Sequence, residues 1–252
     1  MKKLLLATAM VGLSAGAALA QDVVRLGTEG AYPPYNFIND AGEVAGFERE
    51  FGDELCKRAG LNCTWTTNEW DSIIPNLQSG NYDVIIAGMS ITPEREEIVD
   101  FSQGYLQPTA SAYLALSKDT DLKSGPVAAQ TSTIQAAFVA ENGMTLVEYA
   151  TPEETVAAVK NGEAVAVLAD SDYLKPIADE SGGTLVLLDK NEMIGGGVGM
   201  AFRDSDDALR EKFDAAIKSM KCDGTLDAMI VKPEYFGPGS LLVWGDAGKE
   251  GC

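Results

Sequence analysis

Short apolar runs alternate with amphipathic stretches along nearly the whole chain, and this alternation most constrains the fold. Residues 84–87 and 164–169 are apolar runs with the length of buried strands, and residues 23–27 are predicted to form a first strand. Residues 48–59 and 206–221 carry apolar side chains at three- or four-residue spacing, as one face of a helix requires. Strands that alternate with helices predict an α/β architecture with mainly parallel sheets.

Two segments predict where the chain passes between two lobes. No low-complexity linker divides the sequence, but residues 113–116 and the glycine-rich residues 195–199 resemble crossing points. Glycines at the second crossing would ease a hinge rotation, or they form an inert loop. Two crossings predict a first lobe of residues 21–111 plus 200–252, a second lobe of residues 112–199, and a cleft between them.

The first twenty residues are typical of a cleavable export signal. Two lysines precede an apolar stretch at residues 4–16, and Ala-Leu-Ala at 18–20 matches the small-x-small cleavage pattern. The alternative is a membrane anchor, but the apolar stretch is shorter than the roughly 20 residues that a span needs. We therefore expect residues 1–20 to be a signal peptide and the mature protein to lie in the periplasm.

The net charge excludes some partners. The chain has 38 acidic and 19 basic residues, for a formal net charge of −19. Nucleic acid and anionic lipid surfaces would be repelled by such a protein. The charge also attracts cationic ligands, although solubility or adaptation to saline surroundings is the simpler explanation.

Four cysteines in an exported chain favour two disulfides. Cys56 and Cys63 flank a predicted helix-to-strand turn and could staple it, and Cys222 and Cys252 would tie the C-terminal tail to a helix. A zinc site would need closer paired ligands, usually with histidine, and the chain contains no histidine. We expect no metal and no other cofactor.

Two charged residues follow predicted strands and mark the ends of a candidate cleft. Glu29 ends the first strand, where it could neutralise a distal positive charge. Arg95 follows Pro93, which suits a first helical turn, so a carboxylate there would meet a guanidinium fork, free helix N–H groups and the Ser90 hydroxyl. The alternative for Arg95 is a surface ion pair with the acidic residues at 94–97. Together the two residues suit a zwitterion with a cationic tail.

Further candidates stand at strand ends and turns. Asp170 ends a buried strand, where ligand groups gather in open α/β sheets, and could accept an α-ammonium group with the Gly88 carbonyl. Its alternative is a helix cap. Residues 132–134 could offer N–H groups to the carboxylate or simply cap the next helix. Tyr32 and Trp70 could form an aromatic slot, or pack in the core.

Taken together, these residues resemble the periplasmic solute-binding proteins of ABC transporters for polar amino acids. The resemblance spans residues 23–236 and implies two α/β lobes, joined by two strands, that close on the ligand. Its markers are Gly-Thr-Glu at 27–29, Tyr-Pro-Pro at 32–34, Gly-Phe-Glu at 46–48, Met-Ser-Ile-Thr at 89–92 with Arg95, Asp-Phe-Ser at 100–102 and Asp-Gly-Thr at 223–225.

The resemblance also implies a ligand set. Arg95 and the N–H groups near Ser90 and Ile134 would hold an α-carboxylate, while Asp170, Ser90 and the Gly88 carbonyl take the α-ammonium group. The side chain would lie between two aromatic residues and end at a carboxylate, namely Tyr32, Trp70 and Glu29. The Cys56–Cys63 spacing is similar to that in binders of histidine, lysine, arginine and ornithine.

Departures from the pattern narrow the expected ligand. A glutamate at position 29 resembles binders of arginine and ornithine, and of the opines octopine and nopaline. Ala87 and Gly88 stand where lysine and histidine binders often have serines, Ser132 replaces a common glycine, and Ile134 a threonine. We expect a wider, less polar pocket that favours arginine or an opine.

The expected role is capture and delivery to an ABC permease by a monomer. A glutamate or glutamine binder is a weaker alternative, since Glu29 would repel an acidic side chain. The same fold resembles that of a cyclohexadienyl dehydratase, and an enzyme would need a placed general acid. Glu29 is the only evident candidate, and its role as a counter-ion is more economical. We therefore expect no catalytic residue.

Overall fold

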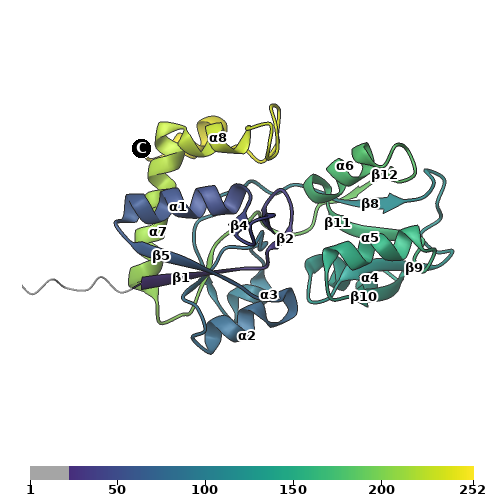
Figure 1. The fold of residues 1–252 in the computed structure, drawn as a ribbon, viewed down its shortest axis with the longest axis horizontal. Helices are drawn as coiled ribbons and strands as arrows, with labels where there is room; N and C mark the ends of the chain where they lie inside the picture. Colours follow the sequence, from purple (N-terminus) through teal and green to yellow (C-terminus); the bar gives the residue numbers. More distant parts are fainter. Residues whose placement is uncertain (1–22) are drawn as a thin grey trace, which may run out of the picture.

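Residues 23–252 are described by the computed structural model, and the expected signal peptide at residues 1–20 lies outside the described residues. The described chain forms two α/β lobes that lie side by side (Figure 1). Each lobe is built on a five-stranded sheet with helices on both faces. The predicted two-lobed α/β fold class is confirmed.

The first sheet combines strands from both ends of the chain, in the order β5-β1-β6-β13-β7. β1 pairs in parallel with β5 and β6, while β13 is antiparallel to β6 and β7, so four strands run one way and β13 runs against them. The strands are β1 (Val23–Thr28), β5 (Asn62–Thr67), β6 (Val84–Ile85), β7 (Asp100–Phe101) and β13 (Ala201–Phe202).

Helices from both ends of the chain cover this sheet. Apolar side chains of α1, α7 and α8 fill one core cluster, and those of α2 contribute to another. α3 is a single short turn that follows the sheet's β6 strand. The helices are α1 (Phe47–Ala59), α2 (Ile73–Gln78), α3 (Pro93–Glu96), α7 (Asp207–Asp223) and α8 (Thr225–Ile230), with a 3-10 turn η1 (Trp70–Ser72).

A small three-stranded sheet joins this lobe between β1 and α1. Its strands β2, β3 and β4 pair antiparallel in sequence order. It carries Tyr32 and Asn36 beside the end of β1. The strands are β2 (Ala31–Tyr32), β3 (Asn36–Ile38) and β4 (Val44–Ala45).

The second sheet repeats the same plan within one continuous stretch of chain, in the order β10-β9-β11-β8-β12. Four strands run one way and β8 runs against them. Helices α5 and α6 pack in one core cluster and α4 in another. The elements are β8 (Ser111–Ala115), β9 (Pro126–Gln130), α4 (Ile134–Glu141), β10 (Thr145–Tyr149), α5 (Pro152–Lys160), β11 (Ala166–Asp170), α6 (Ser171–Glu180) and β12 (Val186–Glu192).

The chain passes between the sheets in residues 102–110 and 193–200, and the two segments pair with each other. The N–H of Tyr105 donates to the carbonyl of Val198 (2.8 Å), and the N–H of Val198 donates to the carbonyl of Leu106 (3.1 Å). The first crossing predicted at residues 113–116 is wrong, because residues 113–115 belong to β8. All five β8 residues are buried, as expected of a strand covered on both faces.

Gly197, in the second crossing, shows why this segment needs glycine. Its φ is +94°, a region that residues with a Cβ rarely adopt. A Cβ there would also lie 2.9 Å from the carbonyl oxygen of Leu106 on the other crossing. The two crossing segments therefore approach more closely than a larger residue would allow.

Both expected cysteine pairs are disulfide-bonded, Cys56 with Cys63 and Cys222 with Cys252. The second bond anchors the C-terminal tail, which includes a 3-10 turn η2 (Gly245–Lys249), to the end of α7. The indole N–H of Trp244 in this tail donates to the carbonyl of Tyr105 (2.8 Å). The tail thus contacts the first crossing segment.

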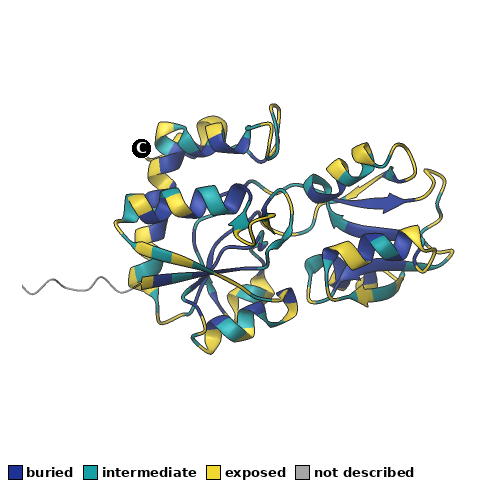
Figure 2. Ribbon diagram, viewed as in Figure 1, coloured by how far each residue is buried: buried dark blue, intermediate teal, exposed yellow. Residues whose placement is uncertain are grey.

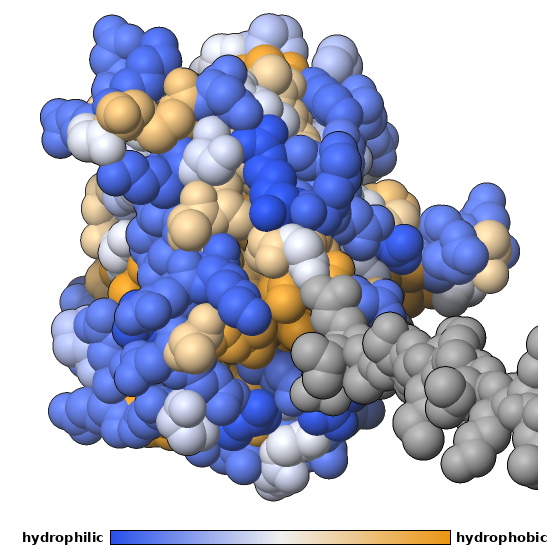
Figure 3. All heavy atoms as spheres, turned by 90° about the vertical axis from the view of Figure 1, so that its left-hand side faces the viewer, coloured by the Kyte–Doolittle hydropathy of each residue, from blue (hydrophilic) through white to orange (hydrophobic). Residues whose placement is uncertain are grey.

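Burial follows the layers of each lobe. Figure 2 shows buried strands and inner helix faces, with exposed residues on the outer helix faces. The end of the first lobe is mostly hydrophilic, with apolar side chains gathered near its centre (Figure 3). None of the helices within residues 23–252 has the length and apolar character needed to cross a membrane.

Candidate functional site

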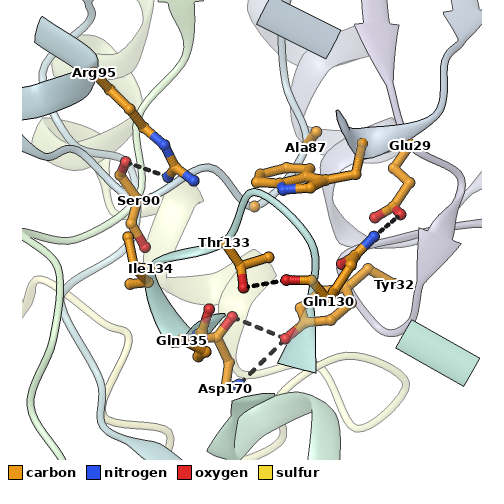
Figure 4. Close-up of a pocket in the computed structure, with 12 residues that line it drawn as sticks. Glu29, Tyr32, Ala87, Ser90, Arg95, Gln130, Thr133, Ile134, Gln135 and Asp170 are labelled. Carbon is orange, nitrogen blue, oxygen red and sulfur yellow. Dashed lines mark hydrogen bonds between the residues drawn. The ribbon is translucent and has the colours of Figure 1, made fainter. Parts of the chain in front are cut away.

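A pocket of about 360 Å³ lies between the lobes, and twelve residues line it (Figure 4). All eight predicted ligand residues are among the twelve: Glu29, Tyr32, Trp70, Gly88, Ser90, Arg95, Ile134 and Asp170. The other four are Ala87, Gln130, Thr133 and Gln135. The structure therefore brings the whole predicted set together at one place.

Arg95 is a partly buried cation at one end of the pocket. Its guanidinium donates to the carbonyl oxygens of Ser90 (2.9 Å) and Ser132 (3.4 Å) and lies 5.4 Å from the Trp70 ring centroid. Within residues 23–252 it forms no ion pair, so the surface-pair alternative is not seen. Burial lowers the pKa of Arg95 to about 10. A desolvated guanidinium of this kind is stabilised by an anion.

Asp170 lies at the end of β11, on the second-lobe side of the pocket. Although it occupies the N-cap position of α6, its side chain makes no capping hydrogen bond. One carboxylate oxygen accepts from the Tyr32 hydroxyl (2.9 Å) and the other from the Gln135 amide (2.9 Å). Burial raises the pKa of Asp170 to about 6, although the hydrogen bonds from Tyr32 and Gln135 lower it. The carboxylate is thus directed at the pocket and not at its helix.

Glu29 follows β1 and reaches across to the second lobe. Its Oε1 accepts a hydrogen bond from the Gln130 amide (2.6 Å). Burial raises the pKa of Glu29 to about 7, with the nearby Glu48 charge adding to the shift. A cation placed beside this carboxylate would lower that pKa and favour the ionised form.

The three charged groups occupy separate positions around the pocket. Figure 4 shows Arg95, Glu29 and Asp170 on different sides of the space between them. When all three are ionised, they carry one positive and two negative charges. Such a set is neutralised by a ligand with one anionic and two cationic groups.

The aromatic residues also join the lobes. Tyr32 stacks on Tyr173 of α6, with ring centroids 4.3 Å apart and planes 14° apart, while its hydroxyl contacts Asp170. The indole N–H of Trp70 donates to the Ser132 carbonyl across the cleft (3.2 Å). Both residues line the pocket, yet one face of Tyr32 is already covered by Tyr173. The roles of Tyr32 and Trp70 as two walls around a ligand side chain stay a prediction.

The start of α4 has an uncommon backbone conformation. Ser132 has φ +58°, a left-handed conformation that favours glycine over residues with a side chain. Thr133 caps the helix, since its hydroxyl accepts from the Ala136 N–H (3.1 Å) and donates to the Gln130 carbonyl (2.6 Å). The capping alternative is therefore right for Thr133, and Ile134 begins the helix at the pocket wall.

Sequence reasoning missed Gln130 and Gln135. Gln130 is the last residue of β9, so the strand-end argument applied to Asp170 would have indicated it too. Gln135 lies in the first turn of α4, where no sequence signal separates a buried amide from a solvated one. No group of three or more residues suited to hold a metal ion occurs in the described part of the chain.

Two α/β lobes joined by two crossing segments, with charged side chains lining the pocket between them, have the architecture of a ligand-binding protein. The chain belongs to the bacterial extracellular solute-binding proteins, family 3, whose sequence profile matches residues 24–237.

Known relatives cover nearly the full length of the chain. The ABC transporter arginine-binding protein 1 of Escherichia coli is 32% identical over 236 residues, which cover 89% of this chain and 96% of that protein. A periplasmic His/Glu/Gln/Arg/opine family-binding protein from Silicibacter pomeroyi, solved in complex with lysine, is 68% identical with a TM-score of 0.84, covering 86% and 98% of the two chains. The ancestral amino acid-binding protein AncCDT-1, a precursor of cyclohexadienyl dehydratase, is 28% identical with a TM-score of 0.74, covering 82% and 93%.

Proposed function

We propose that this protein captures a basic amino acid in the interlobe pocket and delivers it to an ABC transporter permease. The observation that carries the proposal is the match between three partly buried charged groups that line the pocket and the three charges of such a ligand. Arg95 binds the α-carboxylate, Asp170 the α-ammonium group, and Glu29 the cationic end of the side chain.

The state of each charged group supports this assignment. Arg95 is partly buried without an ion-pair partner among residues 23–252, which favours an anion beside it. Burial raises the pKa values of Glu29 and Asp170 to about 7 and 6, so each carboxylate gains from a cation. A neutral or acidic amino acid would leave Glu29 without a counter-ion.

The chemistry of the pocket wall narrows the choice among basic amino acids. Ala87 and Gly88 line the pocket without hydroxyl groups, which suits a guanidinium that bonds mainly to Glu29. We favour arginine and ornithine, and the lysine complex of the 68% identical relative adds lysine as a candidate.

Opines are a second class of candidate ligand, but the residues that line the neighbouring cavity disfavour their binding. An opine carries an extra carboxylate on the α-nitrogen, which would lie near Asp170. The adjoining cavity shares Ser90 and Asp170 with the pocket, and the described residues that line it include neither lysine nor arginine. The extra carboxylate would therefore be buried beside Asp170 without a cation, which is costly.

The site supports binding without turnover. Glu29 has the pKa of about 7 that a general acid would need, but it is bonded to Gln130 and faces the expected ligand cation. The family relatives reported above are binding proteins, including the precursor of a dehydratase. We propose a monomeric periplasmic receptor, exported by the signal peptide, that returns its ligand chemically unchanged.

Isothermal titration of the ligand-stripped mature protein tests this function. The panel comprises arginine, ornithine, lysine, histidine, glutamine, glutamate, octopine and nopaline. We expect tight binding of the basic amino acids, weak or no binding of glutamate, and unchanged ligand by NMR after incubation. Binding of glutamate or glutamine with silence toward every basic ligand would refute the pocket assignment.

Arg95→Ala should abolish binding of every amino acid on the panel, because all share the α-carboxylate. Removing one partner of a desolvated charge pair costs about 2–5 kcal/mol, equivalent to a loss of about thirtyfold or more. Arg49→Ala is the control, since Arg49 forms a surface pair with Asp53 (2.7 Å) outside the pocket. Loss of only one ligand among several would contradict the anchor role.

A further inference from the structure

We propose that Glu48 and Asn36 are positioning residues for ligand capture, forming a buried hydrogen-bond chain whose donor–acceptor polarity fixes two pocket loops. The inference rests on the proposed function, since it concerns the same pocket. Neither residue lines the pocket itself. Both side chains are fully buried within the first lobe, Asn36 on β3 and Glu48 in the first turn of α1.

The chain of hydrogen bonds begins and ends at the pocket. The N–H of Gly30, the residue after Glu29, donates to Asn36 Oδ1 (2.7 Å). Asn36 Nδ2 donates to Glu48 Oε2 (2.7 Å). The N–H of Gly88 donates to Glu48 Oε1 (2.6 Å). One buried carboxylate thus connects the loop that carries Glu29 to the loop that carries Gly88.

The same carboxylate also contacts the hinge. The hydroxyl of Tyr105, in the first crossing segment, donates to Glu48 Oε1. The backbone of Tyr105 pairs with Val198 in the second crossing. Glu48 therefore fixes both loops relative to the segments about which the lobes would rotate.

The polarity of this chain admits few alternatives. A backbone N–H can only donate, so Asn36 must turn its oxygen to Gly30 and its amide nitrogen to Glu48. Gly88 likewise requires an acceptor, so both oxygens of residue 48 must accept. Only a carboxylate does this. Burial raises the pKa of Glu48, while its three donors oppose that rise.

A single substitution at either residue should interrupt this series of hydrogen bonds, one by placing two donors together and the other by placing two acceptors together. Glu48→Gln places an amide N–H against a donor, at either Asn36 or Gly88. Asn36→Asp places a carboxylate oxygen against Glu48 Oε2. In each case a buried polar group is left without its partner, and the cheapest relief is movement of the Gly30 or Gly88 loop. We expect at least a tenfold loss of affinity for each variant.

The double variant Asn36→Asp/Glu48→Gln should restore every bond. The aspartate accepts from Gly30 and from the new glutamine amide, and the glutamine oxygen accepts from Gly88 and Tyr105. The number of carboxylates is unchanged, so recovery would report hydrogen-bond polarity and not total charge. Asn62→Asp, at an exposed position on β5, controls for an added charge on the first lobe.

The experiment compares the parent, both single variants, the double variant and the Asn62→Asp control by isothermal titration with arginine and by thermal unfolding. The expected result is binding at least tenfold weaker in each single variant, and within about threefold of the parent in the double variant. Parent-like single variants, or a folded double variant as weak as the singles, would overturn the proposal.

Two further outcomes are also decisive. If a single variant fails to fold, a folded, binding double variant supports the chain's polarity, and an unfolded double variant refutes it. If the parent binds only glutamine or glutamate from the panel, the proposed function fails. The same comparison made with that amino acid then tests the positioning role on its own.

Discussion

Glu29 combines burial, a raised pKa and a partner from the opposite lobe. Its carboxylate accepts from Gln130 and has a pKa of about 7 because burial disfavours the charged form. A ligand cation at this position would stabilise the ionised carboxylate in place of water. We therefore expect selectivity for basic side chains to depend on this one carboxylate more than on the shape of the pocket.

Glu29→Gln should weaken arginine binding by at least tenfold, because the cationic end of the ligand loses its desolvated partner. Binding of a neutral amino acid such as glutamine should change little or improve. Titration of both ligands against the variant measures the change in selectivity. Glu69→Gln is a matched control, since Glu69 is exposed in a neighbouring groove. Unchanged arginine affinity would remove the distal-carboxylate assignment.

At this scale, the sequence indicated Glu29, Arg95 and Asp170 because ligand groups gather at the ends of parallel strands. It left open whether Asp170 caps a helix, since an aspartate before a helix suits both roles. The contacts with Tyr32 of the first lobe and Gln135 of α4 decide that question, and both join residues that are far apart in the sequence. No local pattern encodes such a contact.

Among the elements, the paired crossing segments depend on the glycine at position 197. Gly197→Ala should lower the free energy of unfolding by about 2 kcal/mol or more, because its φ of +94° adds backbone strain and its Cβ would meet the Leu106 carbonyl at 2.9 Å. Gly162→Ala is the control, with φ +75° and open space, and should cost about 1 kcal/mol. Denaturant unfolding measures both, and equal losses would contradict the close-approach argument.

Element prediction succeeded where the signal was local. The apolar spacing at residues 48–59 and 206–221 predicted two helices, and the structure has α1 (Phe47–Ala59) and α7 (Asp207–Asp223) there. The first crossing was misplaced at residues 113–116, because a strand buried on both faces and a buried linker are both short apolar runs. Pairing of β8 with β11 and β12 is what distinguishes them.

For the whole molecule, the buried carboxylates predict a dependence of stability on pH. The folded-state pKa values of Glu29 and Asp170 are raised to about 7 and 6, so folding favours their protonated forms. Their contribution to stability is present at low pH and is lost as pH rises through about 4 to 7. At about 1.4 kcal/mol per pKa unit, the loss is at most about 3 kcal/mol for each of the two carboxylates, and less in so far as solvent screens them.

A bound basic ligand should offset that loss by pairing with the ionised carboxylates. We therefore expect arginine to raise the unfolding temperature more at pH 7.5 than at pH 5, as measured by differential scanning fluorimetry. In Glu29→Gln the difference between the two pH values should shrink. An equal rise at both pH values would contradict the assigned pKa shifts.

The two disulfides should differ in their effect on stability. Cys222 and Cys252 are 30 residues apart, whereas Cys56 and Cys63 are 7 apart. Loop-closure entropy predicts that replacing Cys222 and Cys252 by serine lowers the free energy of unfolding by about 4 kcal/mol. The same replacement of Cys56 and Cys63 should lower it by about 2.5 kcal/mol. Chemical denaturation of the two double-serine variants tests the order, and a larger loss for Cys56 and Cys63 would reverse it.

The first sheet is completed by β13, which arrives about a hundred residues after β7. A chain that crosses a membrane from its N-terminus cannot finish this lobe until residues 201–230 have also emerged. The second sheet, contained in residues 111–192, can form first. We therefore expect the half of the molecule that begins the sequence to fold last during the proposed export, which would leave β1 and α1 exposed to chaperones and proteases until then.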